Sequence, residues 1–212
     1  MTLDGSLRLL KTLATSRWTW MAMAILSVGL VVLAHNVFQV WLYMPPCEQC
    51  VYIRFAFLVM ALGFIVVALC PQKPWLRWPG SAFALAGGLY GASCSTKLMT
   101  IHHAVHSDSM DDVFGLQGCS LDPHYPFDIP LAQWFPDWFQ PTGDCGYDLS
   151  IVPEGVTLSH WQQWFIDLYG ASDSWYLVPA WKWMSMAECC LLAFGVAITL
   201  IVIFNAIFHW RS

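Results

Sequence analysis

Cys47 and Cys50 carry the clearest chemical signal in this sequence. They enclose Glu-Gln and so have the C-x-x-C spacing, which brings two sulfurs close enough to form a disulfide and commonly lowers the pKa of one thiol. That spacing is typical of a redox-active pair. Pro45 and Pro46 block a helix just before the pair, so we expect a helix to begin at or near Cys50 and to hold its thiolate at the positive helix end.

Arg54 follows Cys50 by four residues and therefore lies on the same face of that expected helix. A cation at this distance would stabilise the thiolate of Cys50 and lower its pKa. The competing interpretation is an interfacial anchor at the start of a membrane span, with the arginine stem among apolar groups and the charge at the surface. Because Arg54 lies directly below a C-x-x-C pair, we favour the chemical role.

A second pair, Cys119 and Cys145, lies 26 residues apart. The residues alone leave two interpretations open: a structural disulfide, which would stabilise the fold by roughly 3–4 kcal/mol through loop closure, or a second pair that exchanges with the first. A zinc site is disfavoured, because this pair has no C-x-x-C spacing and no clustered histidines complete a ligand set, so we expect no metal. Four further cysteines are expected to be apolar fillers or reduced thiols: Cys70, Cys94, Cys189 and Cys190.

The elements that position these residues follow from composition. Of the 212 residues, 58% are hydrophobic and only 11% are charged, whereas soluble domains have about 25% charged residues. A membrane-spanning helix needs roughly 20 mostly apolar residues. Four stretches reach or approach this length: Trp18–Val40, Val51–Leu69, Ser81–Met99 and Ala187–Phe208. We therefore predict an all-α integral membrane protein, with a single domain over residues 1–212 built as a four-transmembrane-helix bundle.

Positive charges near the ends of the spans predict the orientation, because short basic loops stay in the cytoplasm. They are Arg8, Lys11, Arg17, Lys73, Arg77 and Arg211. The first stretch is too long for a cleaved secretory signal and reads as a retained anchor. Both termini are therefore expected inside, which leaves outer loops at about 41–50 and 100–186. The second loop holds eleven acidic residues and one lysine, so the net charge of -5 indicates a solvated loop or a basic partner and not nucleic-acid binding.

The long outer loop divides into a proline-rich part and a helical part. Prolines exclude a long regular element between Cys119 and Cys145. They are Pro123, Pro126, Pro130, Pro136 and Pro141. Farther on, apolar and aromatic residues recur at helical spacing over Thr157–Tyr169, which predicts a short amphipathic helix lying in the headgroup region of the lipid. Membrane anchoring and docking of a protein partner both fit these aromatic residues.

His102 and His103 lie at the outer end of the third stretch. An imidazole there could donate a hydrogen bond to a quinone carbonyl or to its reduced form. An incidental position at the interface is the competing interpretation for both residues.

Three sequence runs together resemble one family. They are Pro46-Cys47-x-x-Cys50-x-x-x-Arg54, Pro130-Leu131-x-x-Trp134-x-Pro136 and Gly143-Asp144-Cys145. These runs, and four spans with a cysteine pair in each outer loop, are similar to the disulfide bond formation protein B (DsbB) family over nearly the whole chain. The resemblance implies a bacterial inner-membrane enzyme that reoxidises a periplasmic dithiol oxidase and passes the electrons to a quinone. This electron-transfer pathway keeps the periplasm oxidising.

The resemblance implies a role for each matching cysteine. Cys119 would be attacked by the thiolate of a DsbA-like or DsbL-like partner. Cys145 would then exchange with Cys47, and Cys50 would pass the electrons on.

The quinone, ubiquinone or menaquinone, would be bound by Arg54 and His102 beside Cys50. The spacing of His102 from Leu89-Tyr90 is similar to that of the family's histidine in the third span. Two departures from the DsbB pattern stand out: extra sequence over Gly146–Trp175, and Ile53 where an acidic residue is expected. The extra sequence favours the DsbI branch of the family and leaves the identity of the partner open.

Two other functions remain to be separated from this one. The first is a membrane scaffold without enzymatic activity, in which both disulfides merely brace the outer loops. The second is a quinone-linked enzyme similar to vitamin K epoxide reductase, in which the C-x-x-C is expected near a later span, whereas here it opens the second.

Overall fold

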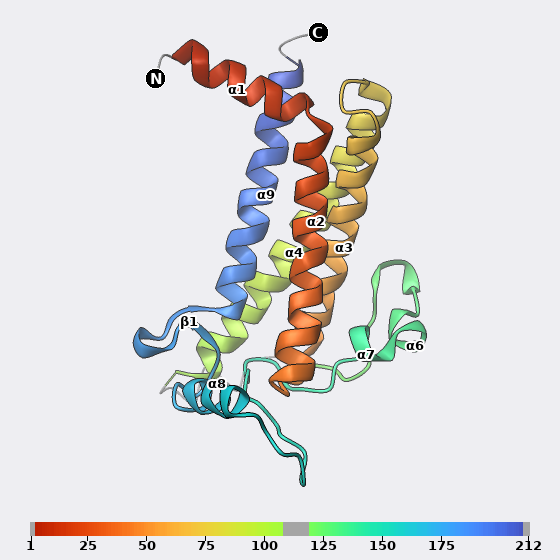
Figure 1. Ribbon diagram of the computed structural model, residues 1–212. Coiled ribbons are helices and arrows are strands. Elements are labelled where there is room, and N and C mark those ends of the chain that lie inside the picture. Colours follow the sequence, from red (N-terminus) through yellow and green to blue (C-terminus); the bar gives the residue numbers. More distant parts are fainter. Residues whose placement is uncertain (1–2, 108–118, 210–212) are drawn as a thin grey trace. The chain divides into compact units, whose positions relative to one another are not determined.

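The protein is mostly helical in a computed structural model that describes residues 3–107 and 119–209 (Figure 1). Its long helices are α1 (Leu3–Thr15), α2 (Arg17–Leu33), α3 (Glu48–Leu69), α4 (Pro74–Val105) and α9 (Met186–His209). Segment 108–118 of the predicted outer loop and Arg211, which contributed to the predicted orientation, lie outside the described residues.

Three helical segments are long and apolar enough to cross a membrane: Arg17–Trp41, Glu48–Leu69 and Met186–His209. They match three of the four predicted spans to within a few residues, so the prediction of a helical membrane protein is confirmed. The remaining predicted stretch, Ser81–Met99, lies inside α4, which is longer than expected. Pro74 begins α4 within the predicted inner loop, because the first helical position needs no intrahelical N–H donor.

The chain divides into two compact units, of which the first comprises Met1–Val31, Ala56–Gly91 and Ala193–Ser212. Arg77 is completely buried in this unit, although the sequence suggested an ordinary loop cation. Its guanidinium donates to Oδ1 of Asn205 at 3.0 Å and to the carbonyl oxygens of Ala14 at 2.9 Å and Phe204 at 2.8 Å. These acceptors satisfy the buried charge, so Arg77 ties three segments of the unit together.

The second unit comprises Val32–Phe55 and Ala92–Leu192 and contains both cysteine pairs. Part of its core is a cluster of Leu42, Met44 and Trp175. The segment between Cys119 and Cys145 contains only short helical turns, as its prolines predicted: η2 (Pro126–Asp128), α6 (Leu131–Trp134) and α7 (Pro136–Phe139).

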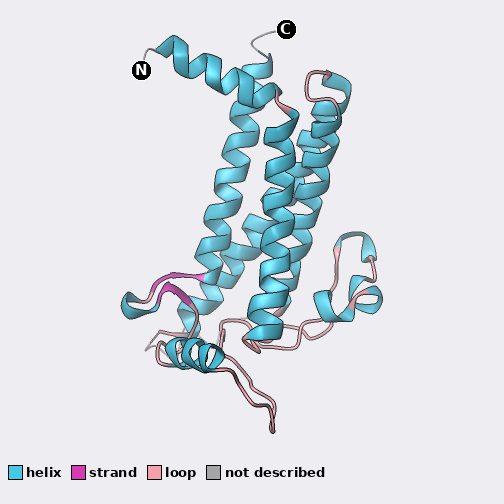
Figure 2. Ribbon diagram, in the orientation of Figure 1, coloured by secondary structure: helices cyan, strands magenta, loops and turns pink. Residues whose placement is uncertain are grey.

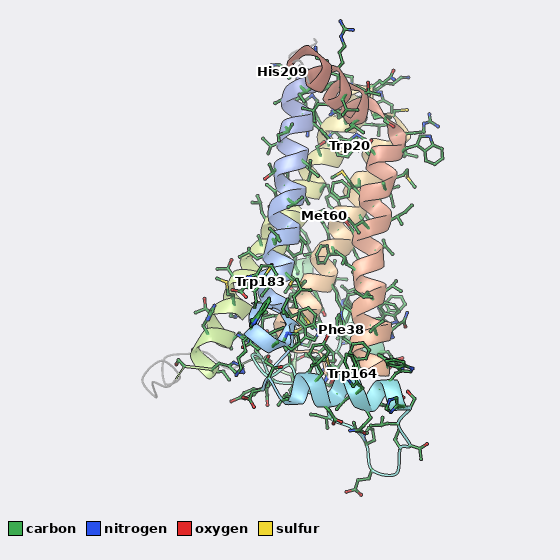
Figure 3. All side chains as sticks on the ribbon, turned by 60° about the vertical axis from the view of Figure 1, so that its left-hand side comes forward. Trp20, Phe38, Met60, Trp164, Trp183 and His209 are labelled. Carbon is green, nitrogen blue, oxygen red and sulfur yellow. A yellow bond between two sulfur atoms is a disulfide. The ribbon has the colours of Figure 1, made fainter. Side chains whose placement is uncertain are left out.

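The predicted amphipathic helix is α8 (His160–Gly170). It begins three residues later than expected, because Ser159 and Gln162 form a capping box that starts the helix. Its aromatic residues divide between two environments. Phe165 and Tyr169 pack on the core cluster, whereas Trp161 and Trp164 are exposed. Trp164 is labelled on this helix in Figure 3.

A β-hairpin precedes α9 and corrects the prediction of an all-α fold (Figure 2). Strands β1 (Tyr176–Val178) and β2 (Trp183–Ser185) pair in antiparallel fashion around the turn η3 (Pro179–Trp181). Three-residue strands are too short to show an alternating pattern, and Lys182 adopts the left-handed conformation without the glycine or asparagine that usually signals it.

Candidate functional site

Both cysteine pairs form disulfides within the second unit. Cys47 is joined to Cys50 and Cys119 to Cys145, with Cα atoms 5.0 and 5.8 Å apart. The four cysteines expected to be without a chemical role, Cys70, Cys94, Cys189 and Cys190, take part in neither disulfide. The second pair, Cys119 and Cys145, is therefore a disulfide, as both interpretations of the sequence required.

The first pair lies at the N-terminus of α3, but Cys47 and not Cys50 is the capping residue. The carbonyl oxygen of Cys47 accepts the N–H of Val51 at 3.1 Å, and its Sγ accepts the N–H of Cys50 at 3.2 Å. The helix begins at Glu48, close to the predicted start at or near Cys50, with Cys50 in its first turn. Both sulfurs still lie at the positive end of the helix, where a thiolate is stabilised.

Arg54 is buried one helical turn below Cys50, with only 5% of its surface exposed. Its Nη1 donates to Oε1 of Gln39 at 2.7 Å and to the carbonyl oxygen of Trp138 at 2.9 Å. An interfacial anchor would extend its charge toward water. The burial and the two protein acceptors therefore contradict the anchor interpretation and leave Arg54 as part of an organised site.

The partner of Arg54 comes from an irregular end of the first span. Residues Ala34–Trp41 form a π-helix, a conformation that is often found at functional sites. His35 in this segment stacks on Trp138 at 3.9 Å between ring centroids, and its Nδ1 lies 3.3 Å from Oε1 of Gln39. Gln39 in turn donates to the carbonyl oxygen of Asp137 at 2.7 Å.

The sequence analysis did not single out His35 or Gln39. Their polarity within an apolar span could have identified them, because polar side chains in a membrane span are costly and are usually functional. Together with Arg54 and Trp138 they form what we call the arginine cluster: His35, Gln39, Arg54 and Trp138.

A hydrogen bond from each side of the second disulfide reaches the C-x-x-C segment. The N–H of Ser120, next to Cys119, donates to Oε2 of Glu48 at 2.9 Å. Glu48 also accepts the hydroxyl of Tyr52 at 3.1 Å, and the hydroxyl oxygen of Tyr52 accepts the N–H of His124 at 2.8 Å. The loop segment that carries Cys119 is therefore held on the first turn of α3.

The loop segment that carries Cys145 is held by a second set of hydrogen bonds. The N–H groups of Thr142 and Gly143 donate to the carbonyl oxygen of Pro46 at 2.9 and 3.1 Å. The approach requires glycine, because a Cβ on Gly143 would lie only 2.7 Å from the carbonyl oxygen of Pro45. The Gly143-Asp144-Cys145 run thus docks on the residues that precede Cys47.

The two sulfurs of the second disulfide differ in exposure. Cys145 is 6% exposed, whereas Cys119 is half-buried. A thiolate from another protein must reach the sulfur that it attacks, so access favours Cys119 as the attacked atom and Cys145 as the leaving group.

His102 lies in a separate polar group at the C-terminal end of α4. Its Nε2 is 3.1 Å from Oγ of Ser174, and its ring stacks on that of His106 at 4.3 Å. His102 lies beyond the predicted span, and burial together with the neighbouring histidines lowers its pKa to about 4. The neighbouring His103 is exposed, with Nε2 3.9 Å from a carboxylate oxygen of Glu188. The described contacts of His102 therefore involve residues other than those of the arginine cluster.

A membrane protein in which hydrogen bonds join the segments around two disulfides, with one disulfide at the start of an apolar helix, has the architecture of a membrane thiol–disulfide oxidoreductase. The profile of the family described as "Disulfide bond formation protein DsbB" matches residues 16–204. The chain belongs to this family and is a protein-disulfide oxidoreductase, which decides against the scaffold and the vitamin K epoxide reductase-like enzyme.

Several matched relatives are DsbI proteins. Protein-disulfide oxidoreductase DsbI of Salmonella typhimurium is 53% identical over 189 residues, which cover 89% of this chain and 84% of the relative. DsbI of Escherichia coli O1:K1 is also 53% identical and is covered to 85%. The putative DsbI of Campylobacter fetus is 50% identical over 190 residues, with 90% and 86% covered. These matches confirm the expected DsbI branch. No solved structure matches the chain.

Proposed function

We propose that the chain reoxidises a periplasmic thioredoxin-fold dithiol oxidase, similar to DsbA or DsbL, and passes the electrons to a membrane quinone. The observation that carries this proposal is the docking of the second disulfide on the first, through Glu48 with Ser120 and through Pro46 with Thr142. Disulfide exchange needs the attacking and attacked sulfurs close together and aligned, and the docking supplies that proximity.

The first half of the reaction moves the disulfide bond outward. A thiolate of the partner attacks Sγ of Cys119, so the Cys119–Cys145 bond breaks and Cys145 leaves as a thiolate. Cys145 then attacks Cys47, which forms a Cys145–Cys47 bond and releases Cys50 as a thiolate. The number of disulfide bonds is conserved in each step.

The second half releases the oxidised partner. Its other thiolate attacks the partner sulfur of the mixed disulfide, so the partner leaves with an internal disulfide and Cys119 becomes a thiolate. Cys119 attacks Cys145, which restores the second pair and frees Cys47. The two electrons of the partner now reside on Cys47 and Cys50, whose thiolates are favoured at the start of α3.

A bound quinone would accept the two electrons of Cys47 and Cys50, so that these cysteines form their disulfide again. The arginine cluster suits such a group. Both described hydrogen bonds of Arg54 use Nη1, and a guanidinium has five N–H donors of the kind that a quinone carbonyl accepts. The stacked rings of His35 and Trp138 add a flat aromatic surface beside it. His102 remains the predicted second hydrogen-bond donor to the quinone.

The same proposal includes the placement in the membrane. Ser81–Met99 within α4 is the fourth span, and the chain forms one four-span domain in the bacterial inner membrane. Both termini are cytoplasmic, and loops 41–50 and 100–186 face the periplasm. The basic residues at the inner ends of the spans support this orientation.

Rapid mixing of the purified protein with a reduced DsbA-like or DsbL-like partner tests the function. Loss of quinone absorbance should follow oxidation of the partner one to one, with ubiquinone and menaquinone assayed separately. The variant Cys50→Ser should abolish quinone reduction and still form a mixed disulfide through Cys119. A wild-type protein that leaves both quinones oxidised would overturn the proposal.

A further inference from the structure

The side-chain amide of Gln39 has an orientation that its neighbours fix. Its Nε2 donates to the carbonyl oxygen of Asp137 at 2.7 Å, and its Oε1 accepts from Nη1 of Arg54 at 2.7 Å. A guanidinium cannot accept a hydrogen bond and a carbonyl oxygen cannot donate one, so the two ends of the amide cannot be exchanged. Oε1 is therefore an acceptor toward every other group that it contacts.

His35 contacts the same oxygen, and this contact sets its tautomer. Its Nδ1 lies 3.3 Å from Oε1 of Gln39. Because that oxygen only accepts, Nδ1 carries the proton of this hydrogen bond. A neutral imidazole has one N–H and one acceptor nitrogen, so Nε2 of His35 is the acceptor.

That Nε2 atom has no hydrogen-bond partner among residues 3–107 and 119–209. The side chain is only 9% exposed, and its ring lies on that of Trp138. Nε2 is not one of the completely buried atoms that lack a partner, so it keeps some access from outside the protein. An unpaired acceptor on a largely buried ring is uncommon in native structures and calls for a functional explanation. Its place in the arginine cluster indicates a ligand that can donate to it.

We propose that His35 is a binding residue for the reduced quinone, with Nε2 accepting a hydrogen bond from a hydroxyl of the hydroquinone. This inference rests on the proposed function, in which the arginine cluster holds the quinone. An oxidised quinone offers only carbonyl acceptors, which the N–H groups of Arg54 can bind and Nε2 of His35 cannot. Reduction adds two electrons and two protons and turns both carbonyls into hydroxyls. Only the reduced form can therefore donate to Nε2.

This selectivity would make the bound quinone a stronger oxidant. Arg54 discriminates little between the two forms, because it can donate to a carbonyl oxygen or to a hydroxyl oxygen. His35 supplies the difference. Binding the hydroquinone tenfold more tightly than the quinone raises the two-electron potential of the bound couple by about 30 mV. The site would thus gain driving force for the oxidation of Cys47 and Cys50.

Binding of a short-chain ubiquinone and of its hydroquinone tests the proposal. The full-length protein carries Cys47→Ser and Cys50→Ser, so that no electrons move while a serine can still cap α3. Both dissociation constants are measured by equilibrium dialysis in nanodiscs under argon, with empty nanodiscs to correct for partition into the lipid. The pH is kept above neutral, where an ordinary imidazole is uncharged.

His35→Phe keeps an aromatic ring beside Trp138 and removes the acceptor. It should weaken hydroquinone binding about tenfold, as expected for the loss of one hydrogen bond, and leave quinone binding within about twofold. His35→Gln provides an amide oxygen that can replace Nε2 as the acceptor. It should recover most of the lost hydroquinone affinity.

Asn36→Leu is the matched control, because it removes a polar but exposed side chain from the same π-helical segment. It should leave both dissociation constants unchanged. Equal weakening of both forms in His35→Phe would overturn the proposal, and so would an unchanged hydroquinone affinity or binding of neither form by the parent protein. Failure of the proposed function is seen separately, as absent quinone reduction by the protein with all four cysteines, because the binding measurement needs no turnover.

Discussion

The carboxylate of Glu48 accepts the backbone N–H of Ser120 at 2.9 Å, across 72 positions of the sequence. Glu48 lies inside the C-x-x-C segment, and Ser120 is the neighbour of Cys119. The bond therefore links the segment around the first disulfide directly to the segment around the second. Because the same carboxylate accepts the hydroxyl of Tyr52, its geometry is fixed from two sides.

Replacing Glu48 should weaken this link and slow exchange between the pairs. A hydrogen bond to a charged group contributes about 1.5–3 kcal/mol, so Glu48→Ala should reduce the single-turnover exchange rate by about tenfold or more. Glu48→Gln retains one acceptor oxygen and should lose less. The measurement is the rate of quinone reduction after mixing with excess reduced partner.

Glu154→Gln, which changes an exposed loop carboxylate in the same unit, provides the comparison. If Glu48→Ala matched this control in exchange rate, the bond between Glu48 and Ser120 would have no part in aligning the disulfides. Attack of the partner on Cys119, measured as mixed-disulfide formation, should change little in Glu48→Ala.

Gly143→Ala should separate the loop segment that carries Cys145 from the segment that precedes Cys47. The added Cβ would lie 2.7 Å from the carbonyl oxygen of Pro45, which is closer than real contacts allow, so the backbone must move. Both hydrogen bonds to Pro46 would weaken, and we expect a loss of about 1–3 kcal/mol in stability. A thermal melt should show a lower Tm, and exchange should slow.

Gly170→Ala is the matched control for this change, because nothing lies within 4 Å of a Cβ at that position. Its Tm should stay close to that of the wild type. Equal melting temperatures for the two variants would show that the close approach at Gly143 does not stabilise the protein.

Local patterns predicted the parts of the site that are close in sequence. The C-x-x-C spacing, the preceding prolines and the position of Arg54 on the same helical face all follow from neighbouring residues, and the apolar runs gave three of the spans. The observed start of α3 at Glu48 agrees with the predicted start at or near Cys50, but the spacing did not show that Cys47 caps the helix with its own sulfur.

Contacts between distant segments could not be predicted in this way. No periodicity encodes the pairing of Glu48 with Ser120, and the choice of Gln39 as the acceptor for Arg54 depends on the π-helical turn, which rotates that residue relative to a regular helix. His102 was selected by its place near the outer end of a span. Its partner Ser174 lies in the extra segment, where the family pattern gave no guide.

Gln39 should control the quinone end of the reaction. Its amide oxygen accepts from the buried guanidinium of Arg54 at 2.7 Å, so Gln39→Leu removes an acceptor from a buried charge and should misplace it. We expect about a tenfold rise in KM for quinone. Formation of the mixed disulfide at Cys119 should be unaffected, because that step takes place at the other disulfide.

Gln133→Leu, at an exposed position of α6 in the same unit, serves as the matched control. An unchanged KM for quinone in Gln39→Leu would remove the arginine cluster from the quinone site. A parallel loss of partner attack would indicate a general disturbance of the fold instead.

Stability should depend on pH through Asp148. Burial raises the pKa of its carboxyl group from 3.8 to about 6, against a smaller opposing effect of the nearby His106. Between these two values the folded protein binds more protons at this site than the unfolded chain does. The contribution of the group is therefore fully present below about pH 4 and is lost as the pH rises through about 6.

His102 acts in the opposite direction, because its pKa is lowered to about 4 and its contribution is lost as the pH falls toward that value. A comparison that changes only Asp148 isolates its effect. The Tm of Asp148→Asn minus that of the wild type should increase from pH 4 to 6 and then level off, since asparagine cannot ionise. A difference for Asp148→Asn that stayed constant over this range would contradict the raised pKa of Asp148.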